Sequence, residues 1–331
     1  MNASSDTVAP SYTQEADFEQ VINTKISLFW QEREQGYIKS KDKKQLFWVK
    51  MTAKHHTRAI FVVNGRIESC WKYQELFYDL FQQGYDIYSF DHRGQGLSER
   101  LIEDKEMGYV DEFDDYVNDM AQMVEHFQLE RYQDSYLLAH SMGGTIATRY
   151  LQTRSSTPFS AISLSAPMFG VSMPWYFRPV ALPLSQIMSA LYSQPTYAPG
   201  YQAYYPKPFE INPLSQSKAR YSWFRDLYEQ MPELKIGGPS THWVWQGLMA
   251  AKQCIQLSRQ IKIPLLLLQA SNEAIVSNEA QSRFIKKLAK TNPNCAMKVI
   301  SGSKHEVLFE KDVYRNSAIQ STLDFFCQHH K

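Results

Sequence analysis

The sequence has few cysteines, almost no net charge and no long apolar run, and each shortage excludes a class of protein. Its four cysteines, Cys70, Cys254, Cys295 and Cys327, lie far apart with no C-x-x-C pair. That usage fits reduced thiols in a cytosolic protein better than a disulfide framework or a zinc site. The 35 Lys and Arg nearly balance 34 Asp and Glu, and a net charge of +1 offers no field for phosphate backbones. We therefore expect no nucleic-acid partner.

The pattern also contains neither a secretory leader nor a membrane span. The first twenty residues carry acidic side chains and no apolar stretch, whereas a secretory signal needs a basic start and about 7–15 apolar residues. The longest apolar segment, residues 263–268, is far shorter than the ~20 residues that cross a bilayer. We expect a cytoplasmic protein that is soluble, or that rests peripherally on the inner face of the membrane.

What the sequence does have is enough apolar material for a large core. Its 331 residues are 44% apolar and 14% aromatic, which excludes a disordered or collagen-like chain. The length allows one large α/β domain with an insertion, or two modest domains.

Short β-rich apolar runs alternate with helix-period segments. Runs rich in Val, Ile and Leu that alternate with helices predict a mostly parallel sheet with helices on both faces. Residues 44–53 have no helix before the next strand and predict a leading antiparallel edge strand. The other expected strands are 58–64, 85–91, 135–141, 161–167, 264–270 and 297–302, and the expected helices are 73–84, 110–127, 142–154, 277–290 and 317–330.

Residues 171–245 interrupt this alternation, because they hold ten of the chain's 15 prolines. Such a segment predicts short helices and loops that cover the carboxyl ends of the strands, where open α/β sheets keep their ligand sites. A loosely packed surface excursion is the alternative. We assign 44–168 and 250–331 to the core domain, 169–249 to an inserted, mainly helical cap, and 1–43 to an N-terminal extension with a helix.

The strongest local signal is the run AHSMGG (139–144), which lies between an expected strand and an expected helix. In a nucleophile elbow, a serine occupies a strained turn and small residues stand two positions before and after it. Ala139 and Gly143 fill those positions around Ser141, with Ala139 replacing the more usual glycine. A chance turn of small residues is the alternative, but the strand-turn-helix setting favours Ser141 as a nucleophile.

A serine hydroxyl needs a base, and the base needs an acid to orient it. In this kind of elbow the expected chain order is Ser, acid, His, and His305 follows the last expected strand. The acid should follow the strand 264–270, which leaves Glu273 and Glu279. We favour Glu273, because Glu279 would open the next helix. Asp312 follows His305 and breaks the order.

A tetrahedral intermediate also needs two backbone donors for its oxygen. One is the N–H of Met142, directly after the nucleophile. The other should come from the loop NGRIES (64–69), in which Gly65 permits close approach and Arg66 supplies the N–H.

Five segments together resemble one family. The sequence resembles the monoglyceride-lipase-like branch of the α/β-hydrolases, and within it the bacterial lysophospholipases most closely. The resemblance covers roughly residues 44–330, and its RIES, DHRGQG and HEVLFEKD motifs are more specific than the elbow alone. The matching segments are NGRIES (64–69), FDHRGQGLSER (90–100), HSMGG (140–144), KHEVLFEKD (304–312) and the run from RYSW to THWVW (220–245).

The resemblance implies an α/β-hydrolase fold with Ser141 as nucleophile, Glu273 as acid and His305 as base. It implies Arg66 and Met142 as the oxyanion donors. The DHRGQG loop should brace the site, with a direct substrate role as the alternative. The chain departs from many relatives, which place a histidine before the glycine of the first motif. The residues expected to support the site are Asn64, Gly65, Asp91, His92, His140 and Gly143.

The insertion would choose the substrate. An aromatic and aliphatic roof suits one fatty tail, since each buried methylene contributes ~0.8 kcal/mol; the insertion's own small core is the alternative. The basic residues could contact a phosphate or be solvated. The residues concerned are Trp175, Tyr176, Phe177, Leu182, Leu184, Ile187, Met188, Leu191, Trp223, Phe224, Trp243 and Trp245, and the cations Arg178, Lys207, Lys218, Arg220 and Arg225.

Apolar residues also recur at helical spacing within residues 18–30. We expect this stripe to dock on the domain, although it or the insertion could touch a membrane. The stripe consists of Phe18, Val21, Ile22, Ile26, Phe29 and Trp30.

These observations predict a serine hydrolase that releases a fatty acid from a single-chain glycerolipid, most closely a lysophospholipid, through an acyl-enzyme. The chemistry needs no metal or organic cofactor. The alternatives are a monoacylglycerol lipase, a short-chain carboxylesterase, a peptidase of the same fold, and a catalytically silent lipid-binding protein. A lipid alcohol that replaced water would give transacylation. The sequence makes no prediction of an oligomeric state.

Overall fold

The computed structural model describes residues 12–330 except 175, 177, 192 and 193. Within this part, eight strands form one sheet in the order β1-β2-β4-β3-β5-β6-β7-β8. The pairs β1–β2 and β2–β4 are antiparallel and the other five are parallel, so the predicted mostly parallel sheet is confirmed. The strands are β1 (Glu34–Lys39), β2 (Gln45–Met51), β3 (Arg58–Val63), β4 (Tyr85–Phe90), β5 (Asp134–His140), β6 (Phe159–Ser165), β7 (Leu265–Ala270) and β8 (Cys295–Ile300).

The edge of the sheet differs from the prediction. We expected residues 44–53 to be the edge strand, but β1 pairs outside β2 and begins at Glu34. The sequence of β1, EQGYIK, has exposed residues alternating with half-buried ones, so it lacks the apolar run that identified the other strands. Gly36 allows β1 to lie against Trp48, since a Cβ there would come within 2.9 Å of the indole ring.

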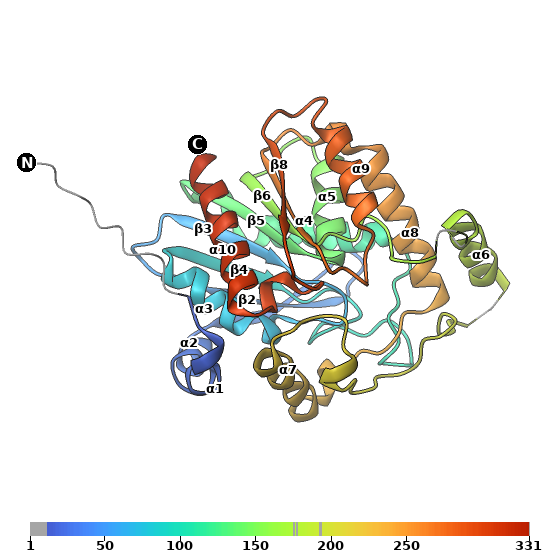
Figure 1. The fold of residues 1–331 in the computed structure, drawn as a ribbon, viewed down its shortest axis with the longest axis horizontal. Coiled ribbons are helices and arrows are strands. Elements are labelled where there is room, and N and C mark those ends of the chain that lie inside the picture. Colours follow the sequence, from blue (N-terminus) through green and yellow to red (C-terminus); the bar gives the residue numbers. More distant parts are fainter. Residues whose placement is uncertain (1–11, 175, 177, 192–193, 331) are drawn as a thin grey trace, which may run out of the picture.

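Helices cover both faces of the sheet (Figure 1). Alternate residues of β3 point to opposite sides: Ile60 and Val62 pack with α3 and α10, whereas Phe61 and Val63 pack with α4, α5, α8 and α9. The main helices of the core are α3 (Gln74–Gln82), α4 (Phe113–Phe127), α5 (Met142–Thr153), α8 (Thr241–Gln256), α9 (Asn278–Leu288) and α10 (Asp312–Gln328).

The last helix begins earlier than predicted. We expected it near residue 317, but α10 starts at Asp312. Its first turn contains Arg315, a fully buried arginine whose Nη2 lies 2.7 Å from Asp79 Oδ2. A charged residue on the inner face of a helix breaks the apolar periodicity on which the prediction depended.

The apolar stripe near the N-terminus packs against the domain. It comprises α1 (Phe18–Val21), a π turn (Ile22–Ile26) and α2 (Ser27–Gln31). Phe18 and Trp30 are buried, the first against Trp223 of α7 and the second against Phe77 of α3. The buried residues 18, 22, 26 and 30 are spaced four apart. In an α-helix with 3.6 residues per turn, positions at this spacing move gradually around the helix. The wider π turn compensates for that rotation and keeps the four residues on one face.

The insertion contains α6 (Arg178–Leu191) and α7 (Lys218–Gln230) and leads into α8. In Figure 1, α6 lies at the outside of the molecule, while α7 lies close to α1. Trp243 is buried in the main core rather than in a roof. Phe224 packs with Tyr228 in a separate small cluster, which residues of the core domain such as Trp71 join. Trp175 and Phe177 lie outside the described residues.

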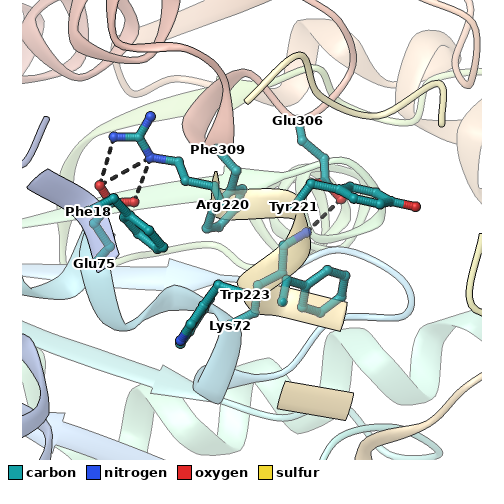
Figure 2. Close-up of a pocket in the computed structure, with 9 residues that line it drawn as sticks. Phe18, Lys72, Glu75, Arg220, Tyr221, Trp223, Glu306 and Phe309 are labelled. Carbon is teal, nitrogen blue, oxygen red and sulfur yellow. Dashed lines mark hydrogen bonds and ion pairs between the residues drawn. The ribbon is translucent and has the colours of Figure 1, made fainter. Parts of the chain in front are cut away.

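The basic residues of the insertion differ in burial and in their partners. We expected Arg220 to contact a phosphate or to be solvated, and both expectations are wrong. Arg220 is buried, with Nε 2.8 Å from Glu75 Oε2 (Figure 2). Its Nη2 lies 2.8 Å from Asp312 Oδ1. These pairs attach α7 to the core. Lys207 and Lys218 are exposed.

No helix in the described part of the chain is long and apolar enough to cross a membrane.

The parallel strands bring distant segments to one edge of the sheet. The loops that contain Arg66, Asp91, Ser141, Glu273 and His305 follow β3, β4, β5, β7 and β8 respectively. Because the carboxyl ends of parallel strands meet on the same side, the fold gathers these loops in one place.

Candidate active site

Ser141 stands alone between the last residue of β5 and the first residue of α5. Its backbone has φ +52° and ψ −118°, a conformation that non-glycine residues rarely adopt and that marks a strained turn. Gly143 makes the turn possible, because a Cβ there would lie 2.4 Å from the carbonyl oxygens of Val63 and Asn64. The predicted elbow geometry is therefore present.

Three side chains from three loops form one hydrogen-bonded chain. Ser141 Oγ lies 3.0 Å from His305 Nε2, and His305 Nδ1 lies 2.8 Å from Glu273 Oε2. Glu273 Oε1 also accepts the backbone N–H groups of Ile275 and Val276, at 2.7 and 3.2 Å. Burial alone would raise the pKa of Glu273, but the bond to His305 and these two N–H groups hold it below its usual value. Glu273 is therefore ionised at neutral pH.

The two rival carboxylates lie elsewhere. Glu279 is in the first turn of α9, exposed, with Oε1 3.2 Å from Arg283 Nη1. Asp312 begins α10 and pairs with Arg220. The structure places Glu273 beside His305.

The two expected oxyanion donors flank the serine. Gly65 approaches the nucleophile so closely that a Cβ on it would lie 3.2 Å from Ser141 Cβ, and Arg66 follows directly. Among the described residues, the backbone N–H groups of Arg66 and Met142 find no acceptor. Two unused donors beside a hydroxyl suit the negative charge that develops on a carbonyl oxygen during attack.

The loop after β4 holds the oxyanion loop from behind, as predicted for its bracing role. Asn64 Nδ2 donates to Phe90 O at 3.0 Å, and the carbonyl of Asn64 lies 3.0 Å from His92 Nε2. Gln95 Nε2 donates to Gly65 O at 2.7 Å. Burial lowers the pKa of His92 to about 4, so this histidine is neutral at pH 7.

Asp91 ties the same loop together. Its two carboxylate oxygens accept the backbone N–H groups of Cys70 and Leu97, at 2.7 and 2.8 Å. Gly96, with φ +59°, leaves room for this carboxylate, because a Cβ there would lie 2.1 Å from Asp91 Oδ2. Burial raises the pKa of Asp91 to about 6. Asp91 therefore acts through the loop conformation.

His140 supports the elbow from the strand side. Its Nδ1 lies 3.1 Å from Ser165 O, the same carbonyl that accepts Ser141 N–H at 3.0 Å. Its ring centroid is 5.0 Å from that of His305. Burial lowers the pKa of His140 to about 4, so it adds no charge beside His305 at neutral pH.

The sequence analysis missed a buried ionic network that joins the oxyanion loop to the His305 loop. Glu68 Oε2 accepts Gly65 N–H at 2.5 Å and Tyr73 O–H at 2.6 Å. Lys72 Nζ lies 2.8 Å from Glu68 Oε1. It also lies 2.6 Å from Oε1 of Glu306, the residue after His305 (Figure 2). The four-residue spacing of Glu68 and Lys72 was the available signal, since opposite charges at that spacing form pairs.

The network fixes the charges of its members. Burial opposes the charge of Glu68, but Lys72 outweighs it and holds the pKa of Glu68 at about 2. Burial would lower the pKa of Lys72, but Glu306 and Glu68 raise it above its usual value. Glu68 and Lys72 are therefore charged at neutral pH, and the ion pairs of Lys72 with Glu68 and Glu306 join the loop that contains Gly65 to the loop that contains His305.

Removing the central cation should unbalance this network. In Lys72→Met, Glu68 and Glu306 remain buried without the cation that pairs with both, so we expect the free energy of unfolding to fall by about 3–5 kcal/mol and kcat to fall with it. Urea unfolding measures the first effect. The control Arg283→Met breaks only an exposed pair with Glu279 and should cost no more than about 1 kcal/mol. Equal losses in both variants would show that the network contributes no more than a surface pair.

Two cavities lie near the insertion, and Ser141 lines neither. One of about 10 Å³, lined by Phe18, Lys72 and Trp223 among others, has room for about one water (Figure 2). The other, of about 170 Å³, lies between α6 and α8 beside Met188. No group of three or more His, Cys, Asp or Glu side chains in the described ranges is arranged to hold a metal ion.

Comparison with known proteins places the chain in a family. Residues 54–312 match the family described as serine aminopeptidase, S33. The chain belongs to this family. It is 38% identical to lysophospholipase L2 of Escherichia coli over 309 residues, which cover 91% of this chain and 89% of that protein. It is 39% identical to the probable lysophospholipase L2 of Haemophilus influenzae over 269 residues, 81% and 83% of the two chains.

Solved structures show the same fold. A soluble variant of monoglyceride lipase from Saccharomyces cerevisiae superimposes with a TM-score of 0.71 at 16% identity, over 90% of this chain and 96% of that one. A carboxyl esterase from Bacillus coagulans gives 0.69 at 15% identity, over 90% and 98%. The predicted α/β-hydrolase fold and the resemblance to lysophospholipases and monoglyceride lipases are confirmed. The protein is a serine hydrolase of the carboxylic ester class.

Proposed function

We propose that the protein is a lysophospholipase that releases the fatty acid from a single-chain glycerophospholipid. The observation that carries the proposal is the hydrogen-bonded chain from Ser141 through His305 to Glu273, with two unused N–H groups beside the serine. The relatives named lysophospholipase L2 support the choice of substrate.

In the first half of the reaction, Ser141 Oγ attacks the ester carbonyl carbon while its proton passes to His305 Nε2. The carbonyl oxygen becomes an oxyanion, which the N–H groups of Arg66 and Met142 stabilise. Glu273 accepts the other ring N–H of His305 and stabilises the imidazolium. The intermediate then expels the glycerol oxygen, which takes the proton from His305, and the acyl group stays on Ser141.

In the second half, water replaces the departed glycerol compound. His305 takes a proton from the water as the water oxygen attacks the acyl carbonyl, and the same two N–H groups stabilise the second oxyanion. Collapse returns the proton from His305 to Ser141 Oγ and frees the fatty acid. Every proton in this cycle is handled by the three side chains, so the cycle uses no metal or cofactor.

The proposed function also gives each of the three parts of the chain a role. The core (44–168 and 250–331) supplies them, and the cap (169–249) covers them; Ser141 is only 8% exposed. The extension (1–43) contributes the docked helix and the strand β1. Its helix contacts α7 of the cap, which supports a cap anchored at one end.

Membrane contact is the further part of the proposal, and α6 would make it. Apolar side chains on this helix are exposed at positions three to four apart: Val180, Leu184, Ile187 and Leu191, between 46% and 73%. Residues 179–191 contain no charged residue. An uncharged helix with an exposed apolar face suits the interface of a bilayer, where single-chain lipids reside. The protein would then work in the cytoplasm, at the inner face of the membrane.

Polar substitutions on α6 test the membrane contact. The double variant Leu184→Ser/Ile187→Ser removes two side chains that would each contribute about 1.5–3 kcal/mol when buried in lipid, so its affinity for phospholipid vesicles should fall at least tenfold. Vesicle sedimentation measures this. Leu28→Ser, on α2, changes a leucine outside the cap that is more exposed than Leu184 or Ile187, and this variant should bind normally. Loss of binding in the Leu28 variant would place the contact on the N-terminal helix instead.

A substrate panel tests the proposed function. Purified protein should hydrolyse lysophosphatidylcholine with a higher kcat/KM than monoacylglycerol of the same chain length or p-nitrophenyl butyrate. A preference for monoacylglycerol or for the butyrate would identify a monoacylglycerol lipase or a short-chain esterase. Activity on prolyl amides but not on esters would identify a peptidase.

A further inference from the structure

Arg66 has a side chain whose surroundings the hydrolysis of an ester does not explain. Its guanidinium extends from the oxyanion loop to the base of the cap, where Nη1 donates to Gly237 O at 3.0 Å. Its Cζ lies 5.4 Å from the ring centroid of Trp243. No carboxylate of the described residues lies within 4.0 Å of it, and the residue keeps partial exposure.

Two other buried cations near the site are neutralised. Lys72 pairs with Glu306 and Arg220 pairs with Glu75 (Figure 2), and Lys72 also pairs with Glu68. For Arg66, burial lowers the pKa to about 10, and only tyrosine hydroxyls offset the loss of solvent. Its guanidinium is still charged at pH 7. A half-buried cation without a counter-ion is costly, and an anion that enters beside it would recover part of that cost.

The place of this cation matches the layout of a lysophospholipid. In the proposed mechanism the backbone N–H of Arg66 binds the ester carbonyl oxygen, and the side chain of the same residue carries the guanidinium. In an acylglycerophosphate, six bonds separate the carbonyl carbon from the phosphorus, a span of about 7 Å when extended. An arginine side chain is of similar length. One residue can therefore contact both the reacting ester and the phosphate.

We propose that the Arg66 guanidinium binds the phosphate of the substrate's head group and selects phosphate-bearing lipids over neutral acylglycerols. The inference rests on the proposed function and adds a specificity-determining residue to it. Arginine presents a planar fork of N–H donors that matches phosphate oxygens. Nη1 remains on Gly237, which orients the fork and leaves the other donors for the ligand.

Arg225 provides a matched control. It is also a partly buried guanidinium without a carboxylate partner among the described residues, with its Cζ 4.9 Å from the ring centroid of Tyr221 and 5.2 Å from that of Phe224. It lies on α7, and both of these rings belong to the same helix. Loss of Arg225 removes the same charge from the cap without touching the residue beside Ser141.

The test is a ratio of specificities. Arg66→Met removes the charge but keeps the backbone N–H, and kcat/KM is measured for lysophosphatidylcholine and for monoacylglycerol of the same acyl chain in identical detergent micelles. The ratio of the two values should fall at least tenfold in Arg66→Met, because a charge-assisted hydrogen bond contributes that much or more. Arg66→Lys should recover part of the ratio, and Arg225→Met should keep it within twofold. Labelling by a fluorophosphonate shows that each variant has folded.

A second measurement uses only the wild-type protein. sn-Glycero-3-phosphocholine should inhibit monoacylglycerol hydrolysis at lower concentration than glycerol does, because it carries the phosphate. An unchanged ratio in Arg66→Met, an equal fall in Arg225→Met, or equal inhibition by the two compounds would each overturn the assignment of Arg66 alone. Wild-type protein that hydrolyses monoacylglycerol but not lysophosphatidylcholine would overturn the proposed function as well.

Discussion

Replacing Ser141 with alanine should lower kcat for lysophosphatidylcholine by about 10⁶-fold, close to the loss of the whole triad. Of the three hydrogen-bonded side chains Ser141, His305 and Glu273, only the serine hydroxyl can form the acyl bond. It lies 3.0 Å from His305 Nε2, and alanine offers neither this oxygen nor its proton. Titration of the released fatty acid measures the effect.

The control for this variant is another buried serine. Ser163 lies in β6, and its hydroxyl bonds to Thr322 Oγ1 of α10 at 2.9 Å rather than to a residue of the catalytic loops. Ser163→Ala should keep kcat within about twofold of the wild-type value. If Ser141→Ala retained most of the wild-type rate, a different nucleophile would have to be sought.

Replacing Glu273 with glutamine should lower kcat by about 10⁴-fold. The amide preserves the shape but offers an N–H₂ group to His305 Nδ1, which favours the wrong tautomer of the ring and removes the charge that stabilises the imidazolium. The pKa of Glu273 is below its usual value, so in the wild type its charge is present through the neutral range and is lost only as the pH falls through that lowered pKa. The loss in the variant should therefore be nearly constant between about pH 6 and pH 9.

Glu279→Gln is the matched control for the acid. Glu279 has the same side chain, follows the same strand and pairs with Arg283 at the surface. Its substitution should leave kcat almost unchanged. A larger loss in Glu279→Gln than in Glu273→Gln would reverse the assignment of the acid.

The arrangement of Ser141, Glu273 and His305 was predictable because each residue follows a strand that the sequence indicates. The elbow around Ser141 is a local pattern, and the chain order then reduces the choice of acid and base to loops after two later strands. Parallel strands bring these loops together without any further information from the sequence. Glu273 lies three residues after the end of β7 and Glu279 nine residues after it, and we chose the nearer residue. The structure places Glu273 beside His305.

Contacts between distant polar residues were not predictable in the same way. Lys72 and Glu306 are 234 residues apart, and neither stands in an apolar pattern. Arg220 appeared as a candidate surface charge, because nothing near it in the sequence shows that Glu75 and Asp312 will surround it. Strand β1 was missed for a related reason, since an edge strand needs little apolar sequence.

The exposed helix α6 and the buried helix α7 share an apolar periodicity, although α7 is rich in charged residues and residues 179–191 of α6 contain none. Both are short, both contain apolar residues at helical spacing, and both come from the proline-rich segment. The two helices differ in burial because they have different contacts. Arg220 and Phe224 attach α7 to the core, whereas Leu184 and Ile187 of α6 are exposed to solvent. A pattern of apolar residues predicts that a face will be covered, but not whether protein or lipid covers it.

The most direct test of the account is to trap the nucleophile. The protein is treated with a long-chain fluorophosphonate, and the modified peptide is sequenced by mass spectrometry while residual lysophosphatidylcholine hydrolysis is measured. The account predicts one adduct, on Ser141, formed in step with the loss of activity and absent after His305→Ala. An adduct on another residue, or full activity in protein that is completely modified at Ser141, would contradict it.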